Sequence, residues 1–359
     1  MIRGRLLRVS AQEHVLLITQ HPIISDSGSM RVLIRELAAL YGAFAAGKGD
    51  PLPPLELQYA DYARWQRQHL PAELLEEQQK FWTQNLSGIP ALMQLPTDRP
   101  RRATQFYSSD QVHLKLSTTL TQRLMTLARQ QRVSLFTTLL SAWATLLGRW
   151  SGQDEVVIGS RVSHRGRPEF EPLIGPFENT MAVRIALQED ATVEQLLKQA
   201  KSTLAQAHAH RDVPFEQVVA ALDPARRQSD RSQGPMLQVL MELNDTPAGV
   251  LGAAELRLPQ LKLDEVSLRN ATTPFELSLS LNEVKGHLCG TLDYASELFD
   301  RETIERMAAC WEVLLKGMVK HVRRPISRVS MLTAAERERV LYGFNETAVA
   351  YPREKLIHE

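Results

Sequence analysis

The chain has 359 residues, of which 43% are hydrophobic and 23% charged, the composition of a soluble globular protein. Its 42 basic and 41 acidic residues give a net charge of +1, which argues against a nucleic-acid footprint or an anionic-membrane anchor. No apolar run approaches a membrane span, and two cysteines, Cys289 and Cys310, are too few for a disulfide framework. These features predict a protein of the reducing cytoplasm.

The first elements surround a polar turn. Val15–Thr19 is an apolar, β-branched run that predicts a buried strand, and a helical period of apolar residues follows over Arg31–Gly47. Between them, His21 and Asp26 stand five positions apart, where a rigid scaffold can present both to a substrate. Residue chemistry alone favours a simpler interpretation, a strand-to-helix loop with an N-cap at Asp26 or a neighbouring serine.

The rest of the chain alternates helices with strands. Helical periods occur at 55–70, 71–88, 117–131, 134–150, 192–209 and 303–319. Strand-like runs occur at 111–116, 155–159, 179–187, 234–243, 256–268, 274–284 and 286–294. A proline-punctuated linker covers 90–105. The chain is therefore expected to contain both helices and strands.

Other polar clusters are weaker candidates for a site. His164, Arg165 and Arg167 form a basic loop, which is usually a solvated surface. His208 and His210 are two residues apart on a helix end, a spacing that does not place them on one face for metal binding. No metal-ligand spacing or phosphate-binding glycine loop is found in the sequence.

The polar turn carries a resemblance to a known family. Residues 21–27, HPIISDS, resemble His-His-x-x-x-Asp-Gly, the active-site motif of the condensation domains of nonribosomal peptide synthetases. His21 and Asp26 match the motif. Pro22 stands in place of the second histidine, and Ser27 stands in place of the glycine.

Further motifs of the same family follow in the same order. Residues 59–65 resemble Tyr-x-Asp-Phe/Tyr-Ala-x-Trp, and their aromatic side chains at helical spacing predict core packing, with Asp61 as a local hydrogen-bonding group. Residues 174–184 resemble Ile/Val-Gly-x-Phe-Val-Asn-Thr-x-x-x-Arg, with Glu178 in place of valine. Residues 210–216 resemble His/Asn-Gln-Asp-x-Pro-Phe-Glu. The end of the chain resembles the linker that leads to an adenylation domain.

The resemblance implies a chloramphenicol-acetyltransferase-like fold, with two α/β lobes and a tunnel between them. On this basis residues 1–54 are the C-terminal remnant of the first lobe with the active-site motif, 55–330 the second lobe, and 331–359 the linker. Two motifs that open the family pattern are absent, so the first lobe is expected to be incomplete. Such a chain is expected to be poorly soluble alone, because the elements that cover residues 16–24 are missing.

The resemblance also implies a reaction. The family joins a donor aminoacyl or peptidyl thioester to an aminoacyl acceptor through an amide bond, in secondary-metabolite and antibiotic biosynthesis. Both substrates are attached to the phosphopantetheine arms of carrier proteins, and the condensation domain itself is expected to bind no cofactor directly. The expected partners are therefore upstream and downstream carrier proteins and an adjacent adenylation domain, without nucleic acid, membrane or metal.

Site residues follow position by position from the motifs. His21 and Asp26 are the catalytic candidates, and Pro22, Ser27 and Asn179 are expected to line the substrate tunnel. Arg184 is the candidate ion-pair partner of Asp26 and hence a structural support of the site.

The residue in the second histidine position predicts impaired chemistry. Proline has no side-chain donor or acceptor and no backbone N–H, so Pro22 cannot take the proton that an acceptor amine sheds. Two alternatives remain open: a condensation-like remnant or carrier-docking module without activity, and an epimerisation domain. The exit linker disfavours the epimerisation domain.

Overall fold

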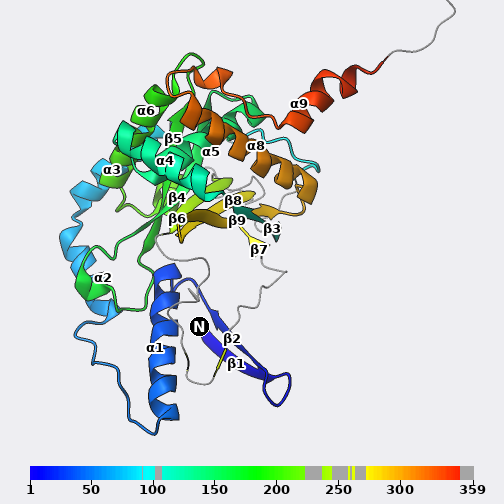
Figure 1. Cartoon of the computed structure of the whole chain (residues 1–359). Helices are drawn as coiled ribbons and strands as arrows, with labels where there is room; N and C mark the ends of the chain where they lie inside the picture. Colours follow the sequence, from blue (N-terminus) through cyan, green and yellow to red (C-terminus); the bar gives the residue numbers. More distant parts are fainter. Residues whose placement is uncertain are drawn as a thin grey trace, which may run out of the picture.

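The computed structural model describes residues 1–90, 92–101, 107–222, 237–244, 258, 261–262 and 272–347. Figure 1 shows a small N-terminal unit, in blue, below a larger body in which helices cover a sheet. The N-terminal unit contains β1 (Ile2–Arg8), β2 (His14–Gln20) and α1 (Ser27–Ala45). The predicted α/β class is confirmed.

The N-terminal unit leaves apolar side chains in solvent. Strands β1 and β2 form an antiparallel hairpin in which Leu6 faces Leu16, and these residues are 68% and 50% exposed. Large apolar residues of the same unit are also exposed: Ile2, Leu7, Val9, Ile23, Leu37, Tyr41 and Phe44. The strand predicted at 15–19 is present but is not buried: among the described residues no layer packs on this face of the two-stranded ribbon, which agrees with the expectation that the cover of residues 16–24 is missing.

This exposed face gives the first prediction. Exposed leucines on a sheet of two strands favour association between chains. The double variant Leu6→Lys/Leu16→Glu is expected to reduce self-association while leaving the thermal midpoint within a few degrees of the unchanged chain. Sedimentation velocity over a range of concentrations measures the association. A monodisperse monomer before substitution would contradict the prediction.

The larger body is built on a mixed sheet whose described strands run in the order β5-β4-β6-β8-β9-β3-β7. Their bounds are β3 (Tyr107–Lys115), β4 (Glu155–Ser163), β5 (Glu178–Ala186), β6 (Val239–Asn244), β7 (Thr272–Thr273), β8 (Leu277–Val284) and β9 (His287–Ala295). β6 is parallel to both β4 and β8, and the other pairs are antiparallel. Residues 256–268, predicted as a strand, lie almost wholly outside the described part of the chain.

Long helices pack on the sheet, as Figure 1 shows above the strands. They are α4 (Thr118–Gln131), α5 (Leu135–Ser151), α6 (Val193–Ala209) and α8 (Arg301–Lys320). Helix α5 is buried on nearly all sides, and its Trp143 meets Trp311 of α8 edge to face at 6.1 Å. The predicted N-cap at Ser134 is confirmed by the hydrogen bond that Thr137 N–H donates to its hydroxyl at 3.0 Å.

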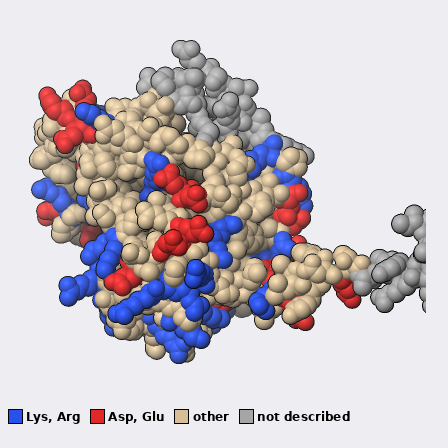
Figure 2. All heavy atoms as spheres, turned by 90° about the horizontal axis from the view of Figure 1, so that it is seen from above, with Lys and Arg blue, Asp and Glu red and all other residues tan. Residues whose placement is uncertain are grey.

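Four other helices of the described residues lie at the margins of the body: α2 (Tyr59–His69), α3 (Ala72–Asn85), α7 (Phe215–Leu222) and α9 (Ala334–Leu341). Exposed basic side chains occur where α4, α6 and the end of α8 meet, and they include Arg132, Lys198, Lys201, Arg323 and Arg324. Viewed from above, Lys and Arg side chains gather along one side of the molecule (Figure 2). The charge of this surface is therefore uneven, although the whole chain is nearly neutral.

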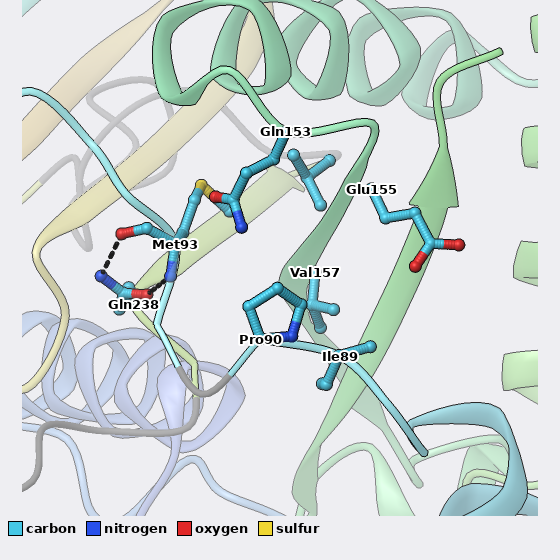
Figure 3. A pocket seen from close by; sticks show the side chains of 8 residues that line it. Ile89, Pro90, Met93, Gln153, Glu155, Val157 and Gln238 are labelled. Carbon is cyan, nitrogen blue, oxygen red and sulfur yellow. Dashed lines mark hydrogen bonds between the residues drawn. The ribbon is translucent and has the colours of Figure 1, made fainter.

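The predicted linker at 90–105 is held against the sheet where it is described. The Gln238 side chain forms two hydrogen bonds with the backbone of Met93. It accepts from the Met93 N–H and donates to the Met93 carbonyl at 3.1 Å. Figure 3 shows these groups around a small pocket with Pro90 and Glu155. The pocket is lined mainly by side chains that pack the linker, so it is a packing feature with no candidate chemistry.

Candidate active site

The motif turn, residues 21–27, begins as a tight turn whose second residue is proline. The Ile24 N–H donates to the His21 carbonyl at 3.0 Å, which places Pro22 at the position that proline favours in a β-turn. The Ile23 N–H donates to Nδ1 of His21 at 3.1 Å. His21 and Pro22 are both exposed. The turn therefore uses one imidazole nitrogen of His21 for its own geometry.

Asp26 is the N-cap of α1, and its carboxylate accepts four hydrogen bonds. Its Oδ1 accepts from the N–H and the hydroxyl of Ser29, each at 2.6 Å, and its Oδ2 accepts from the Phe177 N–H at 2.9 Å. Arg165 Nη2 donates to Oδ1 at 3.0 Å. The Asp26 side chain is 4% exposed, so this carboxylate holds structure together and does not face the solvent.

Arg165 is one of the residues that fasten the motif turn to the larger body, together with the Phe177 N–H on Asp26 and the hydrogen bonds between Ser29 and Gly175. Its guanidinium also donates to the carbonyls of Phe170 at 2.9 Å and Leu173 at 2.6 Å, and it lies 4.1 Å from the centre of the Phe177 ring. A Cβ on Gly28 would approach Arg165 Nε to 2.8 Å, so glycine leaves room for this side chain. The ion pair of Asp26 with Arg165 joins two segments that are 139 residues apart in the sequence.

The predicted pair of Asp26 with Arg184 is wrong. Arg184 Nη2 pairs with Glu155 at 2.5 Å, and its Nη1 donates to the Asn85 carbonyl at 2.7 Å. Arg184 is six residues along β5 from Glu178, or about 20 Å of extended strand away from the end that meets the turn. Arg184 therefore supports the junction of α3 with β4 and is not a support of the Asp26 turn.

The basic loop after β4 is only partly the solvated surface that was predicted: Arg167 is exposed, whereas His164 and Arg165 are not. The Arg165 and His164 side chains are 10% and 13% exposed. Sequence reasoning missed Arg165, and the available signal was only its place in a loop just before the Ile174–Arg184 motif. Its importance comes from a contact between segments far apart in the sequence.

An aromatic cluster supports the loop from the other side. Tyr62 of α2 lies 4.5 Å from the Phe177 ring and 5.1 Å from the Phe170 ring, measured between centroids, and the Tyr59 hydroxyl donates to the Pro176 carbonyl at 3.0 Å. The prediction that the aromatic residues of this motif pack in a core is confirmed. Burial raises the pKa of Tyr62 to about 12, so it remains neutral at physiological pH.

Asn179 binds backbone, and it fixes the segment that precedes α7. Its Nδ2 donates to the carbonyls of Arg211 and Val213, both at 2.7 Å, which brings Asp212 to His164. His164 Nε2 lies 3.4 Å from Asp212 Oδ1, and Gln78 donates to Oδ2 at 2.9 Å. The neighbouring His164 imidazole, together with the hydrogen bond from Gln78, lowers the pKa of Asp212 in spite of partial burial.

The lowered pKa of Asp212 predicts an acid-sensitive part of the stability. A carboxyl whose pKa is lower in the folded state stabilises the fold above its unfolded pKa, and this contribution is lost as the pH falls through the folded pKa. We expect Asp212→Asn to flatten the loss of stability below about pH 4. Urea unfolding at several pH values measures this. An unchanged pH profile would contradict the assignment.

Ser27 and Glu178 meet at the same turn. The Ser27 hydroxyl donates to Oε1 of Glu178, the first residue of β5. Glu178 Oε2 lies 3.6 Å from Arg161 Nη1, and Arg161 Nε lies 3.3 Å from Glu242 Oε1. The predicted site residues therefore separate: His21, Pro22, Asp26 and Ser27 share the turn, while Asn179 and Arg184 act elsewhere on β5.

In the part of the chain that the structure describes, no group of three or more His, Cys, Asp or Glu side chains is arranged to hold a metal ion. In the same residues, no helix is long and apolar enough to cross a membrane.

Comparisons with known proteins agree with the arrangement. The condensation-domain family model matches residues 1–341. The chain is 39% identical to malpibaldin synthetase of Mortierella alpina over 358 residues, and 38% identical to a chondramide synthase of Chondromyces crocatus over 358 residues. Each match covers 100% of this chain, but only 6% and 9% of these relatives.

Solved structures show the same fold. The X-domain from teicoplanin biosynthesis aligns with a TM-score of 0.81 and 30% identity, over 92% of this chain and 75% of that one. The X-domain has also been solved in a complex with OxyB, in which it aligns with a TM-score of 0.80 and 30% identity over 92% of this chain and 73% of that one. With a family model matched along nearly its whole length and the motif turn anchored by Asp26 and Arg165, the chain belongs to the condensation-domain family.

Proposed function

We propose that this chain is part of a nonribosomal peptide synthetase condensation domain, which binds a donor thioester and an aminoacyl acceptor on phosphopantetheine arms. The observation that carries the proposal is the buried pair of Asp26 with Arg165, which holds the motif turn against the larger body. Residues 1–54 are then the end of the first lobe, 55–330 the second lobe and 331–359 the linker towards an adenylation domain.

The amide-forming step of this chain is impaired. The reaction forms a C–N bond to the donor carbonyl and breaks its C–S bond, and the attacking nitrogen must shed a proton. Pro22 offers no group to accept that proton, and His21 uses Nδ1 to hold the turn. Asp26 is occupied by four hydrogen bonds and is equally unsuited to proton transfer.

Binding tests the proposal without relying on turnover. A carrier protein that bears the phosphopantetheine arm is expected to bind the chain more tightly than the same carrier without the arm. Isothermal titration calorimetry with both forms measures the difference. Equal affinities, or no binding of either form, would contradict the proposed function.

A second candidate function is a docking module without condensation activity. Two observations favour it: the loss of the imidazole at Pro22, and the likeness to an X-domain that has been solved in a complex with OxyB. If this candidate is correct, a histidine at position 22 produces no amide, although the carrier still binds.

A further inference from the structure

Two departures from the family motifs touch each other. Ser27 stands where the first motif has glycine, and Glu178 stands where a later motif has valine. The two residues are 151 positions apart, and the Ser27 hydroxyl donates to the Glu178 carboxylate. In this chain a hydrogen-bonded pair, Ser27 with Glu178, therefore replaces the glycine and valine of the family motifs, whose side chains cannot form a hydrogen bond.

Glu178 belongs to a row of charges across three neighbouring strands. Arg161 of β4 stands between Glu178 of β5 and Glu242 of β6, at 3.6 Å and 3.3 Å. Two carboxylates share one guanidinium, so the ionised row carries one excess negative charge. Burial raises the pKa of Glu242, and the nearby Glu178 and Asp293 charges add to the effect while Arg161 opposes it. A further cation would stabilise this row.

The row can be reached from solvent at the turn. The Glu178 side chain is 18% exposed and that of Arg161 is 42% exposed, and Ser27 is an exposed residue. Ser27 directly follows Asp26, whose own charge is compensated by Arg165. Of the carboxylates at the turn, Glu178 is therefore the one that can accept additional hydrogen bonds.

We propose that Glu178 binds the α-ammonium group of the acceptor substrate and so selects amine acceptors at this turn. The inference rests on the proposed function, which brings the acceptor to the turn. A partly buried carboxylate favours an ammonium donor over a neutral hydroxyl, because a charge-assisted hydrogen bond is the stronger one. Glu178 holds the acceptor as its ammonium before reaction. Because an ammonium has no lone pair, it must release a proton before the C–N bond can form, and no bond between heavy atoms is made or broken in the binding step.

The test compares two acceptor analogues that differ in charge. Alanyl and lactyl derivatives of pantetheine, each with an amide NH in place of the thioester sulfur, present an ammonium and a hydroxyl group in the same position. At pH 7 the unchanged chain is expected to bind the alanyl analogue about tenfold more tightly, a difference of about 1.4 kcal/mol. In Glu178→Gln the two affinities should agree within about threefold. Titration calorimetry gives all four values.

Two variants separate charge from packing. Glu178→Val places the residue of the family motif at this position and is expected to lose the preference as Glu178→Gln does. Arg161→Gln perturbs the same row but leaves both carboxylates, so the preference should be at least as large as in the unchanged chain. Loss of the preference in Arg161→Gln would show that the integrity of the row matters and would overturn the role of the Glu178 charge.

The remaining outcomes distinguish the inference from the proposed function. If both analogues bind the unchanged chain with equal affinity, or if Glu178→Gln keeps the preference, the inference is wrong and pantetheine binding still supports the proposed function. If neither analogue binds the unchanged chain, the inference and the proposed function both fail.

Discussion

Replacing Pro22 by histidine is expected to raise the rate of amide formation by roughly two to four orders of magnitude, the usual contribution of a positioned acid or base. The measurement uses a protein that contains both lobes, because donor and acceptor must be held face to face. Carriers loaded with donor and acceptor supply the substrates, and mass spectrometry detects the dipeptidyl thioester.

Pro22→Ala is the matched control for this gain. Both substitutions remove the proline ring from the turn and give up the stabilisation, about 0.4–1 kcal/mol, that a compatible proline provides through the unfolded state. Only histidine introduces an imidazole. A similar rate for the two variants would mean that the backbone of the turn, and not the missing imidazole, limits the reaction.

The second large effect is expected at Asp26. Asp26→Ala removes one member of a buried ion pair and leaves Arg165 without its carboxylate, which typically costs about 3–5 kcal/mol in the free energy of unfolding. Urea denaturation measures the loss. Arg184→Ala is expected to cost about 1 kcal/mol or less for its ion pair, because Arg184 and Glu155 are partly exposed.

Double-mutant cycles identify the true partner of Asp26. The cycle of Asp26→Ala with Arg165→Ala is expected to show a coupling energy of at least about 1 kcal/mol, whereas the cycle with Arg184→Ala should be additive within about 0.5 kcal/mol. Coupling to Arg184 in place of Arg165 would contradict the arrangement of this site.

Local features of the fold could be predicted from the sequence. Ser134 begins α5 because a hydroxyl before an apolar helical period caps the helix, and both signals lie within one short segment. The burial of the strand at 15–19 could not be predicted in the same way. An apolar strand pattern indicates that a strand can be buried, but the layer that covers the strand is formed by residues far away in the sequence.

The site was only partly predictable for the same reason. The motif identified His21 and Asp26 as candidates, because both are recognised by their spacing within one segment of seven residues. The partner of Asp26 depends on which arginine the tertiary fold brings to it. Arg184 had a motif position, whereas Arg165 had only a place in a basic loop. The contact of Ser27 with Glu178 likewise joins two segments that no local pattern connects.

The central claim is that Arg165 holds Asp26 and so keeps the turn in its working shape. Variants that combine Pro22→His with the loss of an arginine test it most directly. If the turn works because Arg165 holds Asp26, the rate gained by Pro22→His should be lost in the double variant Pro22→His/Arg165→Ala. The corresponding variant Pro22→His/Arg184→Ala should keep most of that gain. Amide formation measured by mass spectrometry in a protein that contains both lobes gives both rates. Retention of the gain without Arg165 would contradict the claim that this arginine assembles the active site.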